Sequence, residues 1–231
     1  MSTSQGEAKT RFIDLLSGFL HRFRIVFLVL LAVLLAAVIA YFAWSEWQSA
    51  AREKSILWAE NAQNLYQKWA NEPDLTKKQA TEKELNELLQ RILSKYPRQY
   101  GAQRAQLIMA EMAYEAKDWS KAAGDYLALA QRFPRSYLAP LGLLYGGVCC
   151  EEQGDAQKAL AAYEQLTKRY KDSFLRPRAL FATGRLLEQG GDFAGAKKAY
   201  DQMEEEYPLS NWTKAARNRI IELGIKGKIS E

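Results

Sequence analysis

The sequence predicts an all-α protein in which one apolar N-terminal helix precedes a stack of similar helical hairpins. Three observations lead to this fold class. Residues 25–44 form an unbroken apolar run, no Gly or Pro occurs between Gly18 and Pro73, and three downstream stretches match one another at an offset of 37 residues. A hairpin that cannot cover its own apolar face has to stack on its neighbours, so such repeats build a solenoid.

The apolar run, IVFLVLLAVLLAAVIAYFAW, is predicted to be a transmembrane helix over residues 25–44. Twenty helical residues rise about 30 Å, which matches the hydrocarbon thickness of a bilayer. Tyr41, Trp44 and Trp47 lie at its far end, where amphipathic rings favour the membrane interface. A cleaved signal peptide is the competing interpretation, but its apolar core runs only about 7–15 residues and ends at small residues.

The residues that flank this run predict its orientation. Lys9, Arg11, Arg22 and Arg24 lie in the short tail formed by residues 1–24, whereas Glu46 is the first charge after the run. The positive-inside rule therefore favours an N-terminus inside the cell. In a bacterium, the helix would sit in the inner (cytoplasmic) membrane, and the remaining chain would be periplasmic or otherwise extracytoplasmic.

Two smaller features accompany the predicted span. Ala32, Ala36 and Ala40 recur every fourth residue, and a face of small residues lets two membrane helices approach closely. This face is a candidate for helix packing and for homo-oligomer formation, although alanine is also common in such helices. Before the span, apolar residues share one helical face and predict either an interfacial amphipathic segment or a frayed tail: Phe12, Leu16, Phe19, Leu20 and Phe23.

Residues 45–102 are predicted to form a stalk and a degenerate first hairpin. Ala59, Ala62 and Tyr66 recur at helical spacing, so the apolar helix can continue without a break into a stalk. The stretch NEPDLTKK interrupts it, and a second helix is expected from about Gln79 until Pro97 ends it.

Residues 103–231 are predicted to hold three repeats, over 103–139, 140–176 and 177–210, and then a capping helix near residues 211–223. The matching stretches begin at Lys117, Gly154 and Gly191, and Asp follows each of them. Further residue types recur at the same offset, namely Ala122, Ala159 and Ala196, then Tyr126, Tyr163 and Tyr200, then Phe133, Tyr170 and Tyr207.

Each recurring residue has a physical reason. Gly-Asp suits a tight turn between two helices, because Gly accepts a positive φ without a Cβ clash. The small alanines let the two helices of a hairpin approach closely, and the tyrosine fills the space towards the next hairpin. Pro134 and Pro208 end a second helix because proline cannot donate the next backbone hydrogen bond.

This pattern of A-x3-Y followed by proline, after a G-D turn, resembles the tetratricopeptide repeat. The longer unit ending in YPxS looks like the repeats of bacterial envelope proteins such as the outer-membrane assembly lipoprotein BamD and the Tol-Pal associated coordinator CpoB. The resemblance covers residues 103–208 well and 50–97 weakly. Ala110 departs from the small position that Gly147 and Gly184 occupy, and the usual early tryptophan is absent.

The layout of tail, single span, Trp-rich junction and repeat domain is similar to the ancillary subunit family of the SecYEG translocon (YfgM-like). These resemblances imply a right-handed α-solenoid of about three to four hairpins, with a translocon, a chaperone or envelope-assembly components as protein partners. A structural, self-associating membrane protein without a client groove is the alternative.

The resemblance also implies a protein-binding groove along the first helix of each unit. Its inward positions would create an apolar middle between mixed charges, which suits a peptide or a helix with a few apolar anchors. The same apolar residues could instead pack between neighbouring units. The candidates are Arg104, Leu107, Glu111 and Tyr114, then Leu141, Leu144, Val148 and Glu151, then Arg178, Phe181, Arg185 and Glu188.

The composition argues against several other functions. The net charge of +5 is spread without a basic stripe, so nucleic-acid binding is not expected. His21 is the single histidine, and Cys149 and Cys150 are adjacent, which gives no basis for a disulfide framework or a transition-metal site. No catalytic or nucleotide-binding motif occurs in the sequence, so neither an enzyme nor a cofactor is expected.

Overall fold

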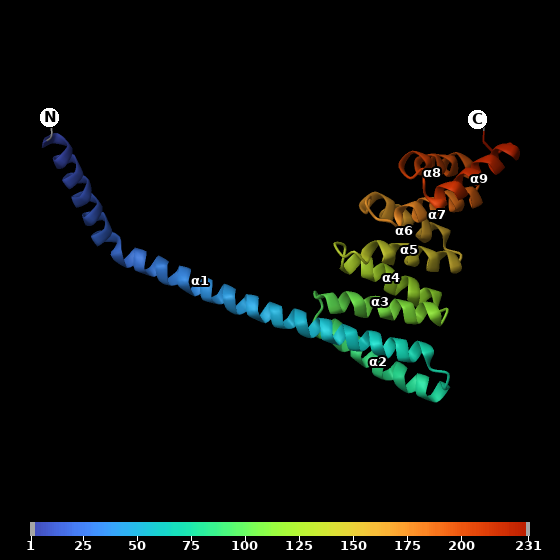
Figure 1. The fold of residues 1–231 in the computed structure, drawn as a ribbon, viewed down its shortest axis with the longest axis horizontal. Coiled ribbons are helices and arrows are strands. Elements are labelled where there is room, and N and C mark those ends of the chain that lie inside the picture. The colour runs from blue at the N-terminus through green and yellow to red at the C-terminus, as the bar shows by residue number, and fades with distance from the viewer. Residues whose placement is uncertain (1–2, 230–231) are drawn as a thin grey trace. The chain divides into compact units, whose positions relative to one another are not determined.

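The computed structural model describes the backbone of residues 3–229 and the side chains of residues 23–26 and 28–229. Every regular element in this part of the chain is an α-helix, and no strand occurs in it. The helices, shown in Figure 1, are α1 (Thr3–Asn71), α2 (Leu75–Lys95), α3 (Tyr100–Glu115), α4 (Trp119–Arg132), α5 (Ala139–Glu152), α6 (Ala156–Arg169), α7 (Arg176–Gln189), α8 (Phe193–Glu206) and α9 (Asn211–Ile225). The prediction of an all-α fold is confirmed.

The chain divides into two compact units, residues 1–53 and 54–231, and the boundary falls within α1. In the first unit, the helix holds an apolar stretch long enough to cross a membrane. None of that stretch is buried, which distinguishes it from the core helix of a soluble protein. Ala32, Ala36 and Ala40 are exposed on it. The side chains of the predicted amphipathic face at residues 12, 16, 19 and 20, and that of His21, lie outside the described residues.

The second unit begins with the last part of α1, which forms a core with α2 and α3. Ala62 and Trp69 of α1 pack with Leu85 and Leu89 of α2 in this core. The helix α2 starts four residues earlier than the sequence predicted. Asp74 caps it, because its carboxylate accepts hydrogen bonds from the first turn of backbone N–H groups at 2.8 and 3.1 Å.

The helices from α3 to α8 form three successive hairpins, α3–α4, α5–α6 and α7–α8, which lie one after another in Figure 1. Gly154 and Gly191 adopt a positive φ at the turns of the second and third hairpins, as predicted, and Lys117 does so in the first with a φ of 56°. The aspartate after each of these residues caps the second helix of its hairpin: Asp118, Asp155 and Asp192.

Neighbouring hairpins are joined by apolar packing and by a repeated hydrogen bond. The Tyr170 hydroxyl donates to the carbonyl of Pro134 at 2.9 Å, and the Tyr207 hydroxyl donates to the carbonyl of Lys171 at 3.3 Å. Each of these bonds links the end of one hairpin to the end of the preceding one. The helix α9 covers the last hairpin, where Leu223 is buried, so the predicted capping helix is present.

Candidate protein-binding groove

The predicted groove residues lie on the first helices of the three hairpins, α3, α5 and α7. Ten of the twelve are partly exposed. Leu107 and Leu144 instead belong to the core, with exposed fractions of 3% and 1%. These two leucines cannot contact a partner in this structure, whereas Val148 on α5 is a partly exposed apolar group.

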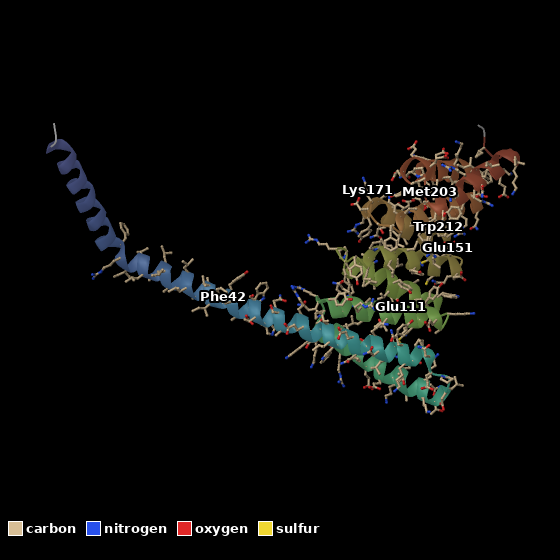
Figure 2. The ribbon with its side chains drawn as sticks, in the orientation of Figure 1. Phe42, Glu111, Glu151, Lys171, Met203 and Trp212 are labelled. Carbon is tan, nitrogen blue, oxygen red and sulfur yellow. The ribbon has the colours of Figure 1, made fainter. Side chains whose placement is uncertain are left out.

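The groove residues on the second and third hairpins form internally paired charge clusters. Glu151 makes an ion pair with Arg185, and its carboxylate accepts a hydrogen bond from the Tyr163 hydroxyl at 2.6 Å. Figure 2 labels Glu151 on α5. Burial and this nearby carboxylate raise the pKa of Tyr163, so the hydroxyl remains a hydrogen-bond donor.

The third hairpin repeats this arrangement with an arginine from the capping helix. Glu188 makes an ion pair with Arg219 of the capping helix and accepts a hydrogen bond from the Tyr200 hydroxyl at 3.2 Å. Burial and the Glu188 charge raise the pKa of Tyr200. Arg219 also bonds Glu222 at 2.6 Å, so the last turn of the groove is held by a small charge network.

A glycine positions the tyrosine in each of these two hairpins. The ring of Tyr163 lies directly against the backbone of Gly147, and the ring of Tyr200 lies against Gly184 in the same way. A Cβ atom at either glycine would overlap the ring. The missing side chain therefore lets the tyrosine reach the glutamate at the end of the first helix.

Two departures from this pattern change the first hairpin. Ala110 occupies the position of Gly147, and Tyr114 occupies the position of Glu151. The Tyr126 ring cannot lie where an alanine Cβ stands, and it stacks on Tyr145 instead, with ring centroids 5.6 Å apart and planes 26° apart. Tyr114 meets the Tyr126 and Tyr145 rings edge-on.

This altered packing leaves a cavity of about 250 Å³ between α1, α3, α4 and α5. Tyr66 donates a hydrogen bond to Glu115 at 2.9 Å at its margin, and Glu111 is labelled on α3 in Figure 2. The residues that line it, here called the tyrosine pocket, are Tyr66, Glu111, Tyr114, Glu115, Tyr126, Leu141 and Tyr145.

The carboxylates of the tyrosine pocket are not ion-paired within the described part of the chain. Desolvation raises the pKa of Glu111, and the Glu115 charge adds to this, while Arg104 opposes it. Arg104 itself hydrogen-bonds the side-chain oxygen of Gln63 on α1. Among the residues with described side chains, no Lys, Arg or His lines the pocket.

The last part of the predicted groove is aromatic. The Phe181 ring lies 5.5 Å from that of Trp212 and 5.9 Å from that of Tyr200. The guanidinium of Arg178 lies over the Tyr145 ring at 5.5 Å and over the Trp212 ring at 5.8 Å. Arg178 therefore bridges the second hairpin to the capping helix through cation–π contacts.

Sequence reasoning missed several residues that complete these clusters. Tyr66 and Tyr145 have no equivalents at the repeat offset, and Trp212 and Arg219 belong to the capping helix. The repeat pattern therefore gave no signal for them. Tyr126 was recognised as a repeat position, but its stacking on Tyr145 could not be predicted from the repeat.

The cysteines have no place in the groove. Both thiols are free and buried, and burial raises the pKa of Cys149 to about 12. A thiol with such a pKa is a weak nucleophile at neutral pH. Among the residues whose side chains are described, no group of three or more His, Cys, Asp or Glu could hold a metal ion.

Two family profiles match the chain. One, described as a tetratricopeptide repeat-like domain, matches residues 26–141, and the other, described as a tetratricopeptide repeat, matches residues 151–211. Among curated proteins, none matches. The first profile covers half of the sequence and runs from the apolar part of α1 to the start of α5, and the second runs from the end of α5 to the start of α9. By its profile matches and its stacked hairpins, the chain belongs to the tetratricopeptide repeat family.

Proposed function

We propose that this protein is a membrane-anchored scaffold that binds a protein partner along the groove of α3, α5 and α7. Tetratricopeptide repeats are protein-interaction scaffolds and are typically non-catalytic, so the family supports the coarser part of the proposal. The observation that carries the finer part is the row of partly exposed side chains on these three helices. It combines aromatic rings, one open cavity and charges of both signs.

The anchor of this scaffold is the apolar part of α1, held with its N-terminus inside the cell. The uncharged stretch is long enough to span a bilayer and none of its described side chains is buried, and Trp44 and Trp47 lie at its end. The first family profile also begins at residue 26, within this stretch. The repeat domain would then be periplasmic or otherwise extracytoplasmic, near translocation or envelope-assembly machinery.

The anchor is tested on membranes from cells that express the full-length protein. Alkaline carbonate should leave the protein in the membrane pellet, and protease added to spheroplasts should digest the repeat domain. Release by carbonate, or an N-terminus that begins after the apolar stretch, would show a cleaved signal sequence instead.

The groove is tested by in-cell photocrosslinking of the full-length protein with probes at Val148 and Phe181. The matched controls carry the probe at Ala161 and Lys198, which are exposed on the second helices α6 and α8. The proposal expects both groove probes to capture the same protein, which also co-purifies in detergent at a fixed ratio. Capture of the protein's own copies would favour the self-associating alternative, and equal capture by the control probes would contradict a groove.

A further inference from the structure

The tyrosine pocket differs from ordinary small-molecule sites in its size and its lining. Its volume of about 250 Å³ lies below the range of roughly 300–1,000 Å³ typical for ligand pockets. One amino-acid side chain fits such a volume better than a cofactor or a drug-sized metabolite does. Three of the predicted groove residues, Glu111, Tyr114 and Leu141, are part of the pocket lining. A chain bound along the groove could therefore insert a side chain into the pocket.

The pocket lining selects for positive charge. Four tyrosine rings and two carboxylates surround the space, and its described lining contains no basic side chain. Aromatic rings attract cations through their negative faces, and they do so more strongly when water is excluded. Arg178 shows this attraction in the same groove, because its guanidinium already lies over the Tyr145 ring.

Comparison with the other two groove glutamates indicates that the described lining of the tyrosine pocket lacks a cation. Glu151 and Glu188, which are largely buried, are each ion-paired with an arginine of this chain, Arg185 and Arg219. Glu111 is also partly buried. The charge of Arg104 acts on it from a distance, but within the described residues Glu111 has neither an ion pair nor a hydrogen-bond donor. Glu111 lies at a different repeat position, equivalent to Val148 and Arg185. Burying a carboxylate costs free energy unless it is paired, so a cation supplied by a partner would offset that cost at Glu111.

We propose that the tyrosine pocket receives a lysine or arginine side chain of a protein partner, with Glu111 and Glu115 as its counter-charges and the tyrosine rings as its walls. This inference rests on the proposed function, since the basic residue arrives on a chain bound along the groove. The partner is thereby assigned a chemical class, namely an exposed segment with one basic anchor that aligns with α3 and apolar anchors that align with Val148 and Phe181.

The test uses the full-length protein in lipid nanodiscs and a library of random peptides displayed on phage. Selected peptides are synthesised in pairs, one with the shared basic residue as lysine and the other with norleucine, which has a similar length but no charge. In the wild-type protein, norleucine should weaken binding about tenfold, which corresponds to roughly 1.4 kcal/mol of charge-dependent attraction.

The same peptide pairs are then measured against the double variant Glu111→Gln/Glu115→Gln. The difference between lysine and norleucine should fall to less than about twofold there, because the counter-charges are gone. A matched variant, Glu152→Gln/Glu205→Gln, removes two exposed carboxylates outside the pocket and should keep the tenfold difference. Circular dichroism checks that both variants are folded.

Three results would overturn the proposal: selection of peptides that share no basic residue, norleucine peptides that bind as tightly as lysine peptides, or equal losses in both double variants. None of these results bears on the crosslinks from Val148 and Phe181. The proposal of a protein-binding groove can therefore stand even if the peptide experiment rejects a basic anchor in the pocket. Absence of crosslinks from Val148 and Phe181 would separately reject the proposed function.

Discussion

The first hairpin, α3–α4, and the two that follow it share one backbone plan but differ in what they leave open. In the later two, a tyrosine passes over a glycine and bonds a glutamate that an arginine neutralises. In the first, Ala110 and Tyr114 replace the glycine and the glutamate, and a cavity appears. The comparison teaches that repeats with one backbone plan can differ in whether their polar groups are paired within the chain and in whether a pocket stays open between the helices.

The largest expected effect on stability comes from replacing the glycine of each later hairpin with alanine, the residue at this position in the first hairpin. The variants Gly147→Ala and Gly184→Ala place a Cβ against the rings of Tyr163 and Tyr200. We expect each to lower the free energy of unfolding by about 1–3 kcal/mol, as overpacking does, in denaturant titrations followed by circular dichroism.

The control for these variants is Gly124→Ala in α4, where no described atom beyond the local helix backbone lies within 4 Å of the added Cβ. This change should stabilise the helix by about 0.5–1 kcal/mol, because alanine favours helix more than glycine does. If Gly147→Ala proved as stable as the wild type, Ala110 could not explain why Tyr126 stacks on Tyr145.

The next effect separates paired glutamates from exposed ones. Glu188→Gln weakens the ion pair with Arg219 and the hydrogen bond from Tyr200, and we expect a loss of about 1–2 kcal/mol in the same titrations, because Arg219 is partly exposed. Glu152→Gln, on an exposed residue near the end of α5, should change stability by less than about 0.5 kcal/mol. Equal effects from the two variants would show that the ion pair adds nothing.

A smaller effect concerns the turn of the first hairpin. Lys117 holds a φ of 56°, where its equivalents Gly154 and Gly191 are glycines. Lys117→Gly should raise stability by about 1 kcal/mol or less, because only glycine adopts this conformation without strain. The reciprocal change Gly154→Lys should lower stability by a similar amount. Melting temperatures of the two variants shifting in the same direction would contradict this explanation.

The smallest effect has the opposite sign from that of Glu188→Gln and depends on pH. Because desolvation raises the pKa of Glu111 in the folded protein, the folded state binds its proton more tightly than the unfolded state. Stability from this group is therefore lost as pH rises from the ordinary glutamate pKa of about 4.3 through the raised value.

Glu111→Gln should accordingly be slightly more stable than the wild type at pH 7, by less than about 1 kcal/mol. The difference should vanish near pH 3, where Glu111 is almost fully protonated in both states. Unfolding titrations at the two pH values measure it, with Glu152→Gln as the control that should show no such dependence. A variant less stable than the wild type at pH 7 would mean that Glu111 has a stabilising partner in the folded protein.

The sequence was sufficient for the helices and the hairpin turns, because these follow from local rules. The period of apolar residues, the positive-φ glycines and the capping helix are visible in single stretches of chain. The start of α2 was placed too late, since the capping role of Asp74 was not recognised.

The candidate site was less predictable because it combines residues that no local rule relates. Tyr66 reaches the pocket from α1 and Tyr145 from α5, and neither recurs at the repeat offset. The repeat pattern also identified an inward face without distinguishing core from surface, so Leu107 and Leu144 were indistinguishable from Val148. The groove and the domain boundaries drawn from sequence stay predictions that the experiments above address.

The hydroxyls of Tyr170 and Tyr207, each bonded to a carbonyl of the preceding hairpin, have a consequence for recognition. Such bonds fix the rotation between consecutive repeats before any partner arrives, so the curvature of the later part of the groove is preformed. A partner would then lose little free energy to ordering that surface. Phe133 occupies the equivalent position in the first hairpin and has no hydroxyl group, so this hydrogen bond cannot form there. The rotation between the first hairpin and the helices before it is therefore less constrained and can change when a partner binds.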